Sequence, residues 1–149
     1  MTTYYSDTAE LLQATLTGQS ANFTPGNVLG GRIAFARSTI ESNGGMVAND
    51  TIQLAFLPKG AVIVPHLCKI CNESFGTTFS IKIGNEQSAN AYANAISLKT
   101  AGEQSFTGAS SALAPVALKK AQWVTATITE ASAVIAQKKA VVWLAYIIP

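Results

Sequence analysis

The sequence predicts an all-β protein that folds as an antiparallel β-sandwich of jelly-roll-like type, with at most one short helix. Two observations carry this prediction. Short segments alternate apolar and polar side chains with a period of two, as residues 77–84 do. Proline and glycine separate these segments, as in Leu57-Pro58-Lys59-Gly60, where a turn is expected. Alternation with turns between the segments is typical of antiparallel strands that each bury one face.

Six segments have the strand pattern, and a seventh short edge strand is expected within residues 101–120, where Pro115 excludes a central position. In chain order the six are residues 32–38, 50–57, 61–70, 77–84, 121–129 and 140–148. The last segment is apolar on both faces, which predicts a central strand or one whose outer face is covered.

Residues 86–100 have a different pattern, with Ala89, Tyr92, Ala93 and Ile96 at helical spacing. A short helix or a loop lying on the sandwich both fit this spacing, and we favour a helical turn or two.

The hydrophobic core is expected to be built from the apolar faces of these strands. The candidate core residues are Ile52, Leu54, Phe56, Phe79, Ile81, Ile83, Val124, Ile128 and Leu144.

The chain of 149 residues is long enough for one domain, which we place at residues 31–149, preceded by an N-terminal arm at 1–30. The arm is rich in turn residues but carries apolar anchors, so it is not expected to be a plain solvated tail. Either it packs on its own sandwich or it reaches a neighbouring subunit. The candidate contacts with a partner or a neighbouring subunit in it are Tyr4, Tyr5, Leu11, Leu12 and Phe23.

Charged residues make up only 12% of the chain, about half of the ~25% typical of soluble domains. This composition suits a protein whose surface is largely covered by copies of itself or by a partner. The ten Lys and Arg residues are scattered, so no basic stripe for nucleic acid is present and direct nucleic-acid binding is not expected. No run of eighteen apolar residues and no signal peptide occur, so no membrane association is expected.

The segment His66-Leu67-Cys68-Lys69-Ile70-Cys71 contains the one combination that resembles a metal site. On a strand, however, residues three apart point to opposite faces, and the chain has no other Cys or His to complete a zinc site. We therefore expect no metal, no Cys68–Cys71 disulfide, and two cysteines that act as small apolar residues.

Catalytic chemistry is not expected, because the single histidine has no nucleophile motif beside it. A pair of carboxylates is not excluded by spacing alone, but the eight acidic residues fall mostly at expected strand ends and turns. No phosphate-binding glycine motif occurs, and no cofactor is expected.

The order of two short motifs, Pro58-Lys59-Gly60 and Ile81-Lys82-Ile83-Gly84, with the strands around them, resembles the small β-sandwich head proteins of tailed bacteriophages. These are cement or decoration proteins, and the resemblance covers roughly residues 30–148. It implies a structural virion protein that binds the outer surface of the phage head and stabilises it by bridging coat subunits.

The same resemblance implies that the partners are the major capsid protein and other copies of the chain, most commonly in a homotrimer. It also implies assembly in the host cytoplasm and a place on the virion, with Trp123 or Trp143 as possible subunit contacts. The resemblance also favours the second possibility for residues 1–30, an arm that reaches a neighbouring subunit, either of the coat or another copy of the chain.

Two alternatives stay open. One is a phage tail, fibre-base or carbohydrate-binding β-sandwich module, for which exposed aromatic residues in loops would be expected, whereas most aromatics here lie in expected strands or in the arm. The other is a small cellular β-sandwich enzyme or lectin-like protein.

Overall fold

The computed structural model describes residues 3–5, 32–106 and 116–148, and these form ten strands and one short 3-10 turn. The strands are β1 (Thr3–Tyr5), β2 (Arg32–Glu41), β3 (Thr51–Leu57), β4 (Val62–Ile63), β5 (Lys69–Asn72), β6 (Thr78–Gly84), β7 (Ala93–Ser97), β8 (Gly102–Ser105), β9 (Gln122–Ser132) and β10 (Lys139–Ile148). The 3-10 turn η2 spans Pro65–Leu67.

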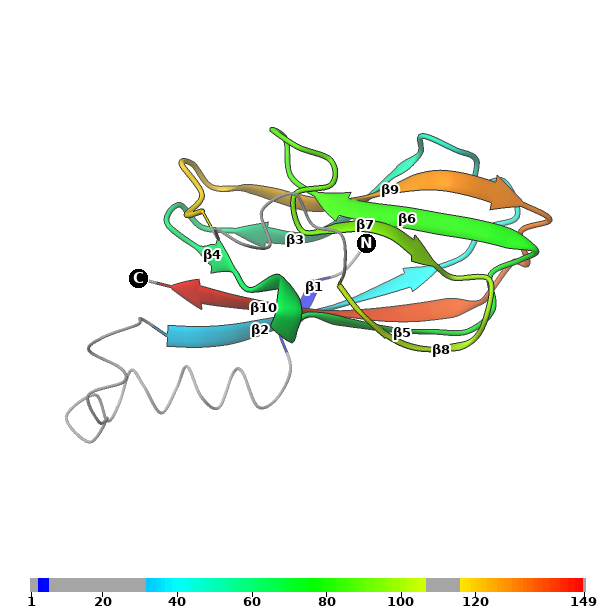
Figure 1. The fold of residues 1–149 in the computed structure, drawn as a ribbon, viewed down its shortest axis with the longest axis horizontal. Helices are drawn as coiled ribbons and strands as arrows, with labels where there is room; N and C mark the ends of the chain where they lie inside the picture. The colour runs from blue at the N-terminus through cyan, green and yellow to red at the C-terminus, as the bar shows by residue number, and fades with distance from the viewer. Residues whose placement is uncertain (1–2, 6–31, 107–115, 149) are drawn as a thin grey trace.

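The strands form two antiparallel sheets packed face to face (Figure 1). Sheet 1 has the order β1-β2-β10-β5-β8, and β4 also pairs with β10. Sheet 2 has the order β3-β9-β6-β7. The predicted antiparallel sandwich is therefore confirmed, and β10 is a central strand, as its two apolar faces indicated.

The pairing follows a nested pattern along the chain. Strand β6 pairs with β7, β5 with β8, β3 with β9, and β2 with β10. The chain from β2 to β10 is thus one long hairpin that is rolled up so that alternate strand pairs fall in opposite sheets. This is the jelly-roll arrangement that the sequence predicted.

The core lies between the sheets. Of the candidate core residues, Ile52 is half-buried and packs against the core. Those that are at most 1% exposed are Leu54, Phe79, Ile81, Ile83, Val124, Ile128 and Leu144.

The prediction that Phe56 belongs to the core is wrong, because this residue is 50% exposed. The register between β3 and β9 shifts between Gln53 and Ala55, so that Leu54 and its neighbour Ala55 are both buried. This bulge reverses the alternation, and Phe56 turns outward as a result.

The preferred helix in residues 86–100 is also wrong, because β7 occupies Ala93–Ser97 there. The register between β6 and β7 shifts, so Ala93 lies opposite Ile83 while Ile96 lies opposite Ile81. Both side chains are buried although they are three residues apart. The bulge therefore places two buried residues three positions apart in a strand, a spacing that is otherwise typical of a helix.

The expected single strand at 61–70 is divided into β4, η2 and the start of β5. Pro65 begins the 3-10 turn, where its missing N–H costs no hydrogen bond. His66 follows it and is exposed to solvent.

The edge strand expected within residues 101–120 is β8, whereas Pro115 lies outside the described residues. At the other end of the chain, β1 pairs with β2, so that Tyr4 lies opposite Arg37 and Tyr5 opposite Ala36. Leu11, Leu12 and Phe23 lie outside the described residues, and the role of the arm stays a prediction. Within the described part of the chain, no helix is long and apolar enough to cross a membrane.

Candidate functional site

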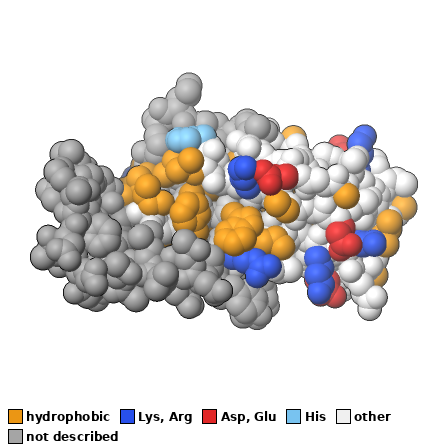
Figure 2. Space-filling view, turned by 90° about the horizontal axis from the view of Figure 1, so that it is seen from below, with side chains coloured by type: hydrophobic (Ala, Val, Ile, Leu, Met, Phe, Trp, Pro, Cys, Tyr) orange, Lys and Arg blue, Asp and Glu red, His pale blue; other side chains and the backbone are white. Residues whose placement is uncertain are grey.

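The outer surface of sheet 1 carries a contiguous group of apolar side chains, which Figure 2 shows on the face seen from below. Strand register brings them together, because Ile147 lies opposite both Ile33 and Val62, and residues directly opposite each other project to the same side. We call this group the apolar face. Its members, none of them fully buried, are Ile33, Phe35, Val62, Val141, Trp143 and Ile147.

Trp143 lies at the centre of sheet 1, opposite Arg37 of β2 on one side and Lys69 of β5 on the other. The guanidinium carbon of Arg37 is 5.8 Å from the centroid of the Trp143 ring, within the range of a cation–π contact. The half-buried indole is thereby held against its own sheet while part of its surface stays accessible.

An ion pair borders the apolar face on the β8 side. The Lys69 ammonium donates a hydrogen bond to Glu103 Oε1 at 2.5 Å. This bond, with the positive charge of Lys69, holds the pKa of Glu103 below its ordinary value, and the carboxylate raises the pKa of Lys69 in return. Both groups are exposed, so solvent screens the pair. It therefore contributes little to the stability of the fold and mainly places two charged groups at the border of the apolar face.

Sheet 1 changes character along its length. At the very start of β10, beyond Val141, the outward residues are charged, and Glu41 lies opposite Lys139. Glu73 is 3.8 Å from the Lys138 ammonium, and it also accepts a hydrogen bond from the Lys139 backbone N–H. The face is therefore apolar at one end and charged at the other, as Figure 2 shows.

The outer surface of sheet 2 has a different composition. Along β9, Thr125, Thr127 and Thr129 project outward between the buried Val124, Ala126 and Ile128. Its largest apolar feature is an edge-to-face pair between Phe56 and Trp123, whose ring centroids lie 5.4 Å apart. This face is therefore mainly neutral and polar, with aromatic surface at one end.

The two cysteines point to opposite sides of sheet 1. Cys68 is fully buried, and its sulfur accepts a hydrogen bond from the Ala145 backbone N–H at 3.2 Å. Burial raises the pKa of the Cys68 thiol to about 12, so it stays protonated at neutral pH. Cys71 is partly exposed, and its thiol lies 3.7 Å from Glu103 Oε2.

These positions give the Cys and His residues no common centre. Both thiols are free, and within the described residues no three His, Cys, Asp or Glu side chains gather as metal ligands would. Cys68 therefore acts as a core residue with a backbone hydrogen bond, while Cys71 belongs to the outer surface beside the apolar face.

No known protein family matches the sequence, and no curated protein is similar to it. The fold, in contrast, is similar to chains of three solved phage capsids. A chain of the "Cyanophage Pam1 capsid asymmetric unit" matches with a TM-score of 0.64 and 17% identity, over 89% of this chain and 96% of that one. A chain of the "Capsid of Ralstonia phage GP4" matches with a TM-score of 0.67 and 21% identity, over 88% and 94%.

The third is a chain of the "Acidic stable capsid structure of Helicobacter pylori bacteriophage KHP30", with a TM-score of 0.53 and 19% identity, over 80% of this chain and 90% of that one. In each case nearly the whole of the capsid chain is covered. The likeness is thus between complete sandwiches of about the same size. At these identities it establishes the shared fold.

Proposed function

We propose that this chain is a structural protein of a phage virion that attaches to the outer surface of the head and stabilises it by bridging coat subunits. The observation that supports this most strongly is the match of the whole sandwich to small chains of three phage capsid structures. The chain would then act by binding and not as an enzyme. Its location would be the virion, after assembly in the host cytoplasm.

The apolar face is the surface we assign to the coat contact. Its residues lie side by side in the strand register, and a contiguous apolar group on a soluble protein commonly marks a binding surface. Trp143 has the features of an anchor, since Trp and Arg are enriched among residues that dominate interface energies. Each copy need bury only a moderate area, because many copies on a lattice act together.

Self-association as a homotrimer is part of the same proposal, as is a capsid-gripping role for residues 1–30. A trimer would give each attached particle three coat contacts and therefore higher avidity than one copy.

The test compares two half-buried tryptophans on the outer faces of strands in opposite sheets, Trp143 in the middle of β10 and Trp123 near the start of β9. Heads of the encoding phage that lack this protein would be incubated with purified chain and pelleted through sucrose. We expect Trp143→Ser to weaken binding by about tenfold or more, since a buried interface anchor commonly contributes over 1.4 kcal/mol. Trp123→Ser, the matched control, should bind as the wild type does.

Two further measurements separate the parts of the proposal. Heads carrying the wild-type chain should resist heat-induced DNA release better than heads without it. The mass in solution, measured by light scattering, should be that of a trimer for the wild type and for Trp143→Ser. A change of mass with Trp143→Ser would make the apolar face a contact between copies, and absence of any binding to heads would overturn the proposal.

A further inference from the structure

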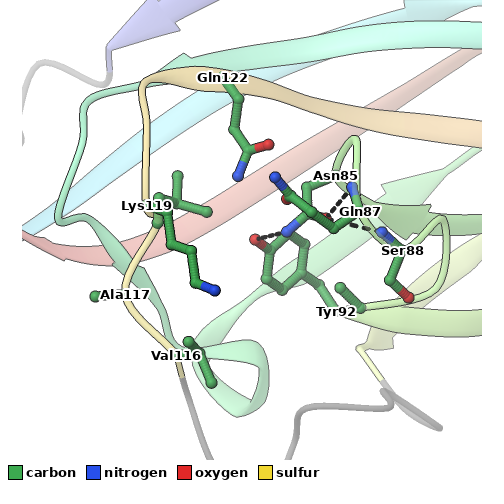
Figure 3. A pocket seen from close by; sticks show the side chains of 10 residues that line it. Asn85, Gln87, Ser88, Tyr92, Val116, Ala117, Lys119 and Gln122 are labelled. Carbon is green, nitrogen blue, oxygen red and sulfur yellow. Dashed lines mark hydrogen bonds between the residues drawn. The ribbon is translucent and has the colours of Figure 1, made fainter.

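A pocket of about 290 Å³ is lined by none of the residues of the apolar face. Two segments that are distant in sequence form its walls. Residues 85–92 connect β6 to β7, and residues 116–122 lead into β9 (Figure 3). Its volume is close to the lower end of the range seen for small-molecule sites.

In the wall formed by residues 85–92, the Asn85 side chain makes three hydrogen bonds. Its carbonyl oxygen accepts hydrogen bonds of 3.0 Å from the backbone N–H groups of Gln87 and Ser88. Its amide nitrogen donates to the Tyr92 hydroxyl at 2.8 Å. Because the hydroxyl oxygen accepts from Asn85, its proton remains available to donate to another group.

The opposite wall is fixed to the sandwich through Leu118, whose backbone carbonyl accepts from Gly60 at 2.8 Å and whose N–H donates to the Ala61 carbonyl at 2.9 Å. An ion pair between Lys120 and Glu86 joins this wall to the other. The pocket is therefore braced on both sides by bonds that do not involve a ligand.

Gln122 forms part of the lining, and its side chain is the least satisfied polar group of the site. The residue is 1% exposed, and its Oε1 atom has no hydrogen-bond partner among the described residues. Figure 3 shows the amide of Gln122 on the pocket side, facing the region of Asn85 and Tyr92. A buried carbonyl oxygen without a donor is unfavourable, so this position favours a ligand that donates a hydrogen bond to it.

The remaining lining defines the chemistry of that ligand. Tyr92 offers a hydroxyl proton, and the Lys119 side chain on the exposed side of the wall offers further donors. Ala91, Val116 and Leu118 provide apolar surface. A molecule that fits must donate to Gln122, accept from Tyr92 and Lys119, and present apolar C–H groups to the walls.

We infer that this pocket binds a single sugar ring. A pyranose has the required size, carries hydroxyl groups that both donate and accept, and has a face of C–H groups suited to an apolar wall. The site is distinct from the apolar face, so a virion-attached copy could hold both ligands. This inference does not depend on the proposed attachment to coat subunits.

The test uses the purified full chain and a panel of glucose, galactose, mannose and N-acetylglucosamine. Each sugar is added at roughly 10–50 mM, because a single-ring ligand is expected to have a dissociation constant in the millimolar range. Saturation-transfer NMR and amide chemical-shift changes would be measured together. We expect at least one sugar to shift the signals of residues 85–92 and 116–122. If no sugar in the panel binds, or if shifts occur only elsewhere, the inference is overturned.

Two glutamine variants separate ligand binding from folding. Gln122→Met keeps the side-chain length and removes the unpartnered oxygen, so it should weaken sugar binding by about tenfold or more without lowering the melting temperature. The matched control is Gln104→Met, because the Gln104 amide donates to the Ser97 carbonyl and to Asn72 Oδ1. That variant should lower the melting temperature and leave sugar binding unchanged.

Tyr92→Phe provides a second, smaller change at the same site, since it removes only the hydroxyl that faces Asn85. We expect several-fold weaker sugar binding with the fold retained. If Gln122→Met and Tyr92→Phe both bind sugar as the wild type does, the observed binding is at another place and the inference is wrong.

Discussion

The two sheets are built in the same way but present different outer surfaces. Each has a long central strand, β10 or β9, whose inward side chains are mostly buried in the core and whose outward face carries a half-buried tryptophan. Around Trp143 the outward residues are mostly apolar, whereas around Trp123 they are mostly threonine. Because folding depends on the inward faces, the outward residues are free to differ, and their difference is the best guide to function.

The inward faces should be equivalent, and this gives the largest expected effect. Leu144 of β10 and Ile128 of β9 are both fully buried in the one core cluster. Leu144→Ala and Ile128→Ala should each lower the free energy of unfolding by about 2–5 kcal/mol, measured by urea denaturation. If only one of the two variants were destabilised, the sheets would not share a single cooperative core.

Two glycines, one in each sheet, test how tightly the neighbouring backbone packs against a strand end. A Cβ added at Gly84, at the end of β6, would approach the Ser88 and Ala89 backbone far too closely, whereas one added at Gly102 of β8 would meet nothing within 4 Å. We expect Gly84→Ala to cost about 1–3 kcal/mol, because the backbone of the following loop must move. Gly102→Ala should stay within about 0.5 kcal/mol of the wild type.

Thermal unfolding followed by circular dichroism would compare the two glycine variants directly. A neutral Gly84→Ala would mean that residues 85–92 are not held against β6 as the structure has them. The same result would weaken the case for a preformed pocket behind that loop.

The smallest effect concerns the two cysteines of sheet 1. Cys71 should react with a thiol reagent in the folded protein, while Cys68 should react only on unfolding, because it is buried and its pKa is raised to about 12. Partial burial, followed by the charge of Glu103, raises the pKa of Cys71. Glu103→Gln should therefore increase the thiolate fraction and the labelling rate of Cys71 at pH 8.

Mass spectrometry of the labelled protein would assign each site. The matched variant is Lys69→Met, which removes a positive charge that lowers the pKa of Cys71. It should slow the labelling. Equal rates in both variants would show that the ion pair does not control this thiol.

Much of the fold could be predicted from the sequence, because period-two alternation is a local property of each strand. It located β6, β9 and β10 and identified the buried Ile81, Ile128 and Leu144. The errors occurred where a bulge adds a residue to one strand only. Phe56 and the segment around Ala93 both lie beside a register shift, which depends on the partner strand and leaves no local mark.

The candidate sites were less predictable than the fold. Trp143 could be named as a possible contact, but Arg37 and Lys69 become its neighbours only through pairing across three strands. The pocket was missed because its walls are distant in sequence and meet only in the folded chain. One local sign was present, since Gln122 is a polar residue in phase with the buried Val124 and Ala126.

The position of β10 has a consequence for the order of events during synthesis. It is the last of the described strands to leave the ribosome, yet β2 and β5 are joined only through it. Until β10 has emerged, β2 and β5 have no strand between them, and the apolar face around Trp143 cannot form. Under the proposed function, a nascent chain would be unable to occupy a place on the head before its own sandwich has closed, so incomplete copies would be kept out of the particle.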